Sequence, residues 1–108
     1  MKKVIITGAA GFIGKALCRK LSTYSEVIGV DTMGRPAWAS DIVWAQVDLT
    51  DIDAVSKVFK RYLPDVVVHC AGIAHQKIGA VDLNTYMHVN SEATETLAKA
   101  VAESNPGV

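Results

Sequence analysis

Three glycines at regular spacing precede the first helical pattern of the chain. They lie in the run Thr7-Gly8-Ala9-Ala10-Gly11-Phe12-Ile13-Gly14, directly after a short β-branched segment. Gly8 would permit a tight turn out of a strand, Gly11 would leave room for a pyrophosphate, and Gly14 would let the helix lie close to the sheet. The N–H groups at a helix N-terminus attract anions, so the run predicts a phosphate-binding turn. The alternative is a compact strand-to-helix turn without a ligand.

A carboxylate follows at the end of the second predicted strand. Asp31 comes seventeen residues after Gly14, near the spacing of about 20 at which an acidic residue accepts the ribose hydroxyls of a dinucleotide. Such a carboxylate would repel the 2′-phosphate of NADP, whereas the guanidinium of Arg35 would attract it. The glycines and Asp31 together predict a dinucleotide site that prefers NAD to NADP. A turn-forming aspartate is the alternative for Asp31 alone.

Alternating strand-like and helical patterns would position these residues. Apolar residues with helical spacing predict a first helix from Gly11, with Ile13, Leu17 and Leu21 on its buried face. A second helix is predicted after a cap at Thr50 or Asp51, and a third near the end of the chain. β-branched or alternating segments predict strands over residues 3–7, 26–30, 42–47 and 65–71.

The order of these elements indicates an α/β fold. Strands alternating with helices predict a Rossmann-like, doubly wound parallel sheet with strand order 3-2-1-4. Residues 32–41 are expected to form a loop with at most one helical turn, which is short for a parallel crossover. We therefore expect residues 1–108 to form a single dinucleotide-binding domain.

Composition narrows the class of protein. The chain has 108 residues, of which 50% are hydrophobic, and a formal net charge of zero. Interspersed charges argue against a nucleic-acid surface, and the apolar runs are too short to cross a membrane. Two cysteines are too few for a disulfide framework, and the histidines lack metal-ligand spacing. We expect a cytoplasmic domain without a metal ion.

The T-G-x-x-G-x-x-G spacing, with Phe12 and Ile13 before the last glycine, resembles a known family. It is similar to the extended short-chain dehydrogenase/reductases, which are NAD-dependent epimerases and dehydratases of nucleotide sugars. The resemblance covers essentially the whole chain, and it implies that residues 1–108 are an incomplete N-terminal domain, truncated before the fifth strand and without the substrate-binding region of the family. It implies a Rossmann fold, NAD as the cofactor, a nucleotide sugar as the substrate of the full-length relative, and a homodimer.

Three later segments also resemble the family. Asp48-Leu49 matches an acidic-apolar pair that meets the adenine, and His69-Cys70-Ala71-Gly72 matches a segment lining the pyrophosphate and nicotinamide ribose. Asn90 matches a helix residue on the cofactor side. Each has an alternative: Asp48 precedes a cap, Gly72 is a turn, and Asn90 is a helix-surface residue. The implied cofactor-binding residues are Gly8, Gly11, Phe12, Ile13, Gly14, Asp31, Asp48, Leu49, Cys70, Ala71, Gly72 and Asn90.

No catalytic residue is assigned. The resemblance implies a Tyr-x-x-x-Lys pair whose tyrosine acts as the general acid and base, but Tyr24, Tyr62 and Tyr86 are not followed by a lysine at that spacing. We therefore expect the NAD-binding portion of an epimerase or dehydratase, able to bind a dinucleotide without turning over a substrate. The alternatives are an NADP-dependent reductase of the same branch and a non-catalytic module that senses or binds a dinucleotide.

Overall fold

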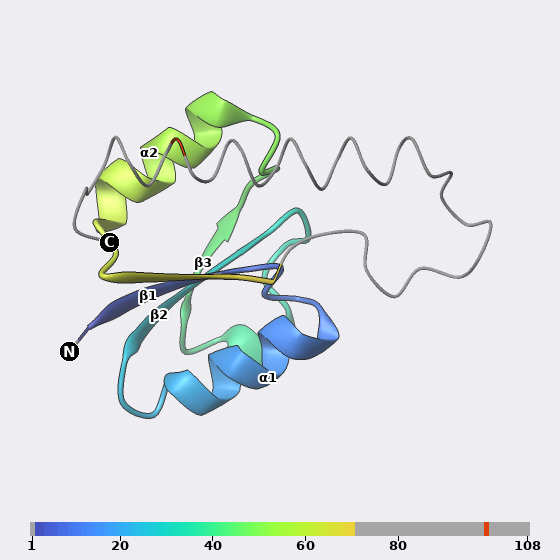
Figure 1. Ribbon diagram of the computed structural model, residues 1–108. Helices are drawn as coiled ribbons and strands as arrows, with labels where there is room; N and C mark the ends of the chain where they lie inside the picture. The colour runs from blue at the N-terminus through green and yellow to red at the C-terminus, as the bar shows by residue number, and fades with distance from the viewer. Residues whose placement is uncertain (1, 71–98, 100–108) are drawn as a thin grey trace.

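The computed structural model describes residues 2–70 and residue 99 (Figure 1). Four parallel strands form one sheet in the order β3-β2-β1-β4, which confirms the predicted topology. The strands are β1 (Lys3–Thr7), β2 (Glu26–Asp31), β3 (Val43–Gln46) and β4 (Val66–His69). The helices are α1 (Phe12–Leu21) and α2 (Ile52–Tyr62), with a short 3₁₀ helix η1 (Ala37–Ala39).

The two α-helices cover opposite faces of the sheet (Figure 1). The β-branched residues of the central strands β1 and β2 are buried on both faces, as expected for a parallel sheet between helices. The core on the α2 side contains Ile5, Ile28, Val30, Leu49, Val55 and Phe59. The core on the α1 side contains Val4, Ile6, Ala9, Cys18, Val27, Ala39 and Ile42.

Helix α2 forms as the sequence predicts. Asp51 is its N-cap, because its Oδ1 accepts a hydrogen bond from the Ala54 amide at 3.2 Å. The helix ends at Leu63, whose backbone is left-handed with φ 47° and whose N–H donates to the Phe59 carbonyl. Val55 and Phe59 of this helix are buried.

The buried face of α1 differs from the prediction. Gly14 and Cys18 are buried, Leu17 and Leu21 are half-buried, and Ile13 is 53% exposed. Because Gly14 approaches the Gly8 backbone closely, the face of α1 that carries Gly14 and Cys18 packs toward the sheet. The prediction was therefore wrong for Ile13, and it overlooked Cys18 as a core residue.

The short crossover between β2 and β3 contains a single helical turn, as predicted. This crossover, all of whose residues the structure describes, has no long helix. The rings of Trp38 and Trp44 pack edge to face beside it, with 6.0 Å between the ring centroids. The ring of Trp44 lies over Gly29, where a Cβ atom would come within 2.8 Å of it. Two indole rings therefore cover part of the sheet face that a crossover helix would cover.

Some predictions differ at their limits or fall outside the described residues. Strands β3 and β4 are shorter than the predicted 42–47 and 65–71, although the Asp65 amide still donates to the Lys3 carbonyl at 2.8 Å. The last predicted helix lies outside the described residues, except that residue 99 is helical. Within residues 2–70 and at residue 99, no helix is long and apolar enough to cross a membrane.

Candidate functional site

The candidate site lies where β1 and β2 end, at the carboxyl edge of the sheet. Ligands of open α/β sheets bind at this edge. The turn after β1 begins with Gly8, whose φ of 66° suits glycine because it has no Cβ atom. The Gly8 carbonyl accepts a hydrogen bond from the Gly11 amide at 3.0 Å, and the Ala9 amide donates to the Val30 carbonyl at 3.2 Å. The turn is therefore fixed to β2 before α1 begins.

The missing side chains of Gly14 and Gly11 serve different purposes. A Cβ atom at Gly14 would overlap the Gly8 carbonyl and lie 2.9 Å from the Cα atom of Ala9, so the fold itself requires glycine there. Gly11 has φ −76° and ψ 174°, an extended conformation open to any residue. Its added Cβ would meet only the Gly8 carbonyl oxygen, at 3.3 Å. A side chain at Gly11 would therefore make a tight contact that the Gly8 carbonyl must relieve by a small shift, and the absence of a side chain leaves room for a ligand.

The N-terminus of α1 is suited to an anion. No side chain caps it, and its first turn contains no acidic residue. At α2, by contrast, Asp51 caps the helix and Asp53 lies in the first turn. Uncapped amides and the helix dipole attract negative charge. Of these two α-helices, α1 therefore offers the better phosphate site.

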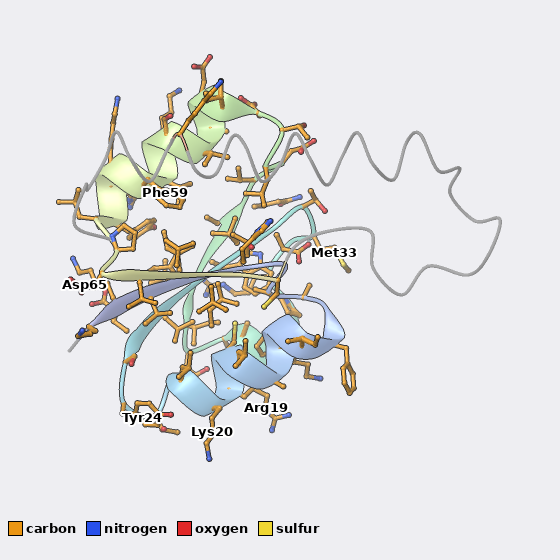
Figure 2. The ribbon with its side chains drawn as sticks, viewed as in Figure 1. Arg19, Lys20, Tyr24, Met33, Phe59 and Asp65 are labelled. Atoms are coloured by element: carbon orange, nitrogen blue, oxygen red, sulfur yellow. The ribbon has the colours of Figure 1, made fainter. Side chains whose placement is uncertain are left out.

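Asp31 joins the glycine-rich turn to the end of β2. Its Oδ2 accepts from the Ala10 amide and its Oδ1 accepts from the Met33 amide, each at 3.0 Å. Figure 2 places Met33 at the carboxyl edge of the sheet, opposite Asp65 and Tyr24. A carboxylate has about four acceptor positions, so Asp31 retains capacity for ribose hydroxyls. The sequence analysis missed the bond to Ala10, because it depends on how the turn folds back on β2.

Asp48 and Leu49 have clear local roles. The Oδ1 of Asp48 accepts from the Thr50 amide at 2.9 Å and from the Thr50 hydroxyl at 2.8 Å, which holds the turn before α2. The side chain of Leu49 is buried in the core on the α2 side. A contact between Leu49 and a cofactor would therefore use its backbone. Contacts of Asp48 and Leu49 with a cofactor stay predictions.

The remaining predicted residues are dispersed. Phe12 is 89% exposed beside the exposed Ile13, while Cys70 is half-buried. Burial raises the pKa of the Cys70 thiol, and burial followed by the nearby Cys70 raises the pKa of Cys18 to about 11. Both thiols are therefore protonated at neutral pH. Ala71, Gly72 and Asn90 lie outside the described residues, and the described part of the chain contains no cluster of metal ligands.

Sequence reasoning missed a side-chain pair beside the turn. The hydroxyl of Thr7, at the end of β1, lies 2.7 Å from Nδ1 of His69, at the end of β4. Burial lowers the pKa of His69. The available signal was the position of both residues at the ends of strands, but their pairing depends on the register between β1 and β4.

The arrangement fits a dinucleotide. The start of α1 can hold a pyrophosphate above Gly11, and Asp31 stands on the neighbouring strand where an adenosine ribose would follow. Because Ala10 bonds directly to Asp31, the two parts of the site are held together.

The sequence matches a family of known proteins and is similar to named enzymes of two bacteria. Residues 4–108 match the family described as NAD dependent epimerase/dehydratase. The chain is 29% identical over 108 residues to dTDP-glucose 4,6-dehydratase of Haemophilus influenzae, covering 90% of this chain and 32% of that protein. It is 30% identical over 111 residues to the Neisseria meningitidis enzyme of the same name, covering 93% and 31%.

A solved structure agrees in fold. The Thermus thermophilus UDP-glucose 4-epimerase complex with NAD has a TM-score of 0.82 and 27% identity, over 94% of this chain and 34% of that one. The chain therefore spans about a third of the length of these relatives.

Proposed function

The chain belongs to the NAD dependent epimerase/dehydratase family, and from that premise we propose that it binds NAD as the cofactor-binding portion of a nucleotide-sugar epimerase or dehydratase. The first turn of α1 receives the pyrophosphate above Gly11, and Asp31 accepts the adenosine ribose hydroxyls. The observation that carries the proposal is the uncapped, acid-free start of α1 beside a carboxylate fastened to the same turn.

The longer relatives suggest the wider role. When bound, NAD would supply hydride-transfer chemistry at a sugar carbon. This chain's part is to hold the dinucleotide at the carboxyl edge of the sheet, with Asp48, Leu49, Cys70, Ala71, Gly72 and Asn90 as further proposed contacts. The substrate class we propose is a nucleotide sugar, the class named in the dehydratase and epimerase relatives. A homodimer and a cytoplasmic location complete the proposal.

Replacing Gly11 with valine tests the phosphate site. The extended backbone of Gly11 suits a β-branched residue, but the added Cβ would lie 3.3 Å from the Gly8 carbonyl oxygen, so we expect the free energy of unfolding to fall by about 1–2 kcal/mol. The new side chain would occupy the space of the pyrophosphate, and NAD affinity should fall at least about tenfold, or about 1.4 kcal/mol. Isothermal titration calorimetry with NAD measures the affinity, and urea unfolding measures stability.

Gly34→Val is the matched control. An added Cβ at Gly34 meets only the Gln46 side chain, at 3.7 Å, in an exposed loop. It should leave NAD affinity unchanged. Equal affinity in Gly11→Val and the wild-type chain would refute the phosphate site above Gly11.

NADP is the second candidate cofactor, because the exposed Arg35 lies four residues beyond Asp31. We expect the charge of Asp31 to dominate, giving at least about tenfold tighter binding of NAD than of NADP. Asp31→Asn should narrow this preference by removing the charge that repels a 2′-phosphate. Calorimetric titrations with NAD and with NADP measure this preference in the wild-type chain and in Asp31→Asn. Tighter binding of NADP by the wild-type chain, lost in Arg35→Ala, would identify NADP as the cofactor.

A further inference from the structure

The ends of β1 and β4 meet at a small polar cluster inside an apolar sheet. Thr7 is fully buried, and the strand register places it opposite His69. The Thr7 hydroxyl lies 2.7 Å from Nδ1 of His69. The Cys70 amide donates to the hydroxyl and to the carbonyl oxygen of Thr7, each at 3.1 Å. One buried hydroxyl therefore joins the imidazole and the backbone of β4 to β1.

The donor and acceptor in the bond between the Thr7 hydroxyl and Nδ1 of His69 depend on the tautomer of the imidazole. Since Oγ1 accepts the hydrogen of the Cys70 amide, its own hydrogen can be donated to Nδ1 of His69. Nδ1 is then the acceptor, and the ring proton is on Nε2. This arrangement requires a neutral imidazole, because a protonated ring carries hydrogen on both nitrogens.

The cluster is adjacent in sequence to the proposed cofactor site. Thr7 directly precedes Gly8, where the glycine-rich turn begins, and Cys70 is itself a proposed contact. We propose that Thr7 and His69 are positioning residues, which hold the end of β4 against the glycine-rich turn in the geometry that binds the dinucleotide. The proposal rests on the proposed function and assigns no contact between either side chain and the cofactor.

Among the described residues, the titratable side chains that bear on the charge of His69 lie on β1, on α2 and next to His69 on the chain. On β1 the titratable side chain is Lys3, at the opposite end of the strand from Thr7. The charged residues of α2 are exposed; they are Asp53, Lys57, Lys60 and Arg61. The described titratable residue that directly follows His69 on the chain is Cys70. Burial lowers the pKa of His69, so its neutral form predominates at neutral pH.

The sign of the pH effect follows from this lowered pKa. The unfolded chain binds a proton at His69 at a higher pH than the folded chain does, so acidification favours unfolding and weakens the cluster. The contribution of neutral His69 is fully present above its ordinary pKa of about 6.5 and is lost as the pH falls through the lowered folded value. NAD affinity should decline over the same range.

The test measures NAD affinity by calorimetry from about pH 5 to about pH 8. At neutral pH, Thr7→Val should lower affinity about tenfold, because the Cys70 amide and the imidazole lose a partner. Thr7→Ser keeps the hydroxyl and should return affinity to within about threefold of wild type. Thr23→Val is the control, because Thr23 is an exposed residue whose hydroxyl bonds the Lys20 carbonyl after α1.

Variants of His69 provide an independent arm should Thr7→Val not fold. His69 is exposed enough to be replaced, and His69→Leu should weaken NAD binding. His69→Asn offers a side-chain amide near the position of Nδ1 and does not titrate, so it should bind NAD with a flatter pH profile. An equally steep profile in His69→Asn, or equal affinities in Thr7→Ser and Thr7→Val, would overturn the proposal.

Hydrogen exchange of the Cys70 amide separates this proposal from the proposed function, because it needs no nucleotide. Exchange should quicken at least about tenfold in Thr7→Val and recover in Thr7→Ser. If the wild-type chain binds no NAD, the proposed function fails and the positioning role fails with it. If the wild-type chain binds NAD but neither affinity nor exchange responds to Thr7→Val, the positioning role alone fails.

Discussion

Gly14→Ala is expected to destabilise the chain severely and to abolish NAD binding. The added Cβ would overlap the Gly8 carbonyl oxygen and lie 2.8 Å from the Gly8 carbonyl carbon. The Gly8 atoms belong to the backbone, so no side chain can rotate away, and α1 must separate from the turn. Overpacking typically costs about 1–3 kcal/mol and occasionally more, and the contact with backbone atoms puts Gly14→Ala at the upper end of that range. Urea unfolding followed by far-UV circular dichroism measures the loss, and calorimetry measures NAD binding.

Gly34→Ala is the control for this prediction, because it makes the same chemical change in an open loop. Its unfolding midpoint should stay close to that of the wild-type chain. If the midpoints of Gly14→Ala and Gly34→Ala were the same, the close packing of α1 on the glycine-rich turn would be wrong.

Phe59→Ala is expected to remove about 3–5 kcal/mol from the free energy of unfolding. Phe59 is 1% exposed and lies on α2 within the core that α2 shares with β1 and β2 (Figure 2). Truncation leaves a cavity that neighbouring side chains fill only in part. Because small domains have a net stability of about 5–15 kcal/mol, this loss would remove between about a fifth and nearly all of it.

Lys60→Ala provides the comparison on the same helix. Lys60 is adjacent and exposed, so its replacement should change stability by no more than about 0.5 kcal/mol. A loss in Phe59→Ala as small as that in Lys60→Ala would show that α2 does not seal this side of the sheet.

The sequence predicts the sheet well because its central strands, β1 and β2, are largely buried. Runs of β-branched residues such as Val4, Ile5 and Ile6 have few alternatives to a central parallel strand, and the order of elements then favours one topology. The cap at Asp51 is predicted for a similar reason, since its short carboxylate reaches an amide within the same turn. Local chemistry is sufficient in both cases.

The missed features depend on contacts between distant segments. Ile13 lies in the apolar stripe of α1, yet the approach of Gly14 to Gly8 turns the helix so that Cys18 is buried instead. The bond from Ala10 to Asp31 requires the turn to fold back on β2, and the pair of Thr7 with His69 requires the register of β4. Hydrophobic periodicity carries no information about which residues of distant segments come into contact.

The two tryptophans of the chain give this domain an optical probe with a known location. Trp38 and Trp44 lie edge to face, and Nε1 of Trp44 donates to the Met33 carbonyl, two residues beyond Asp31. Coupled indoles at this distance produce a near-ultraviolet dichroism signal that depends on their mutual orientation. The near-ultraviolet dichroism and the fluorescence of the two indoles therefore report on β3 and on the segment that precedes it, whereas far-ultraviolet dichroism reports on the whole backbone. Divergence of the two signals during unfolding would show that this edge of the sheet opens before the rest.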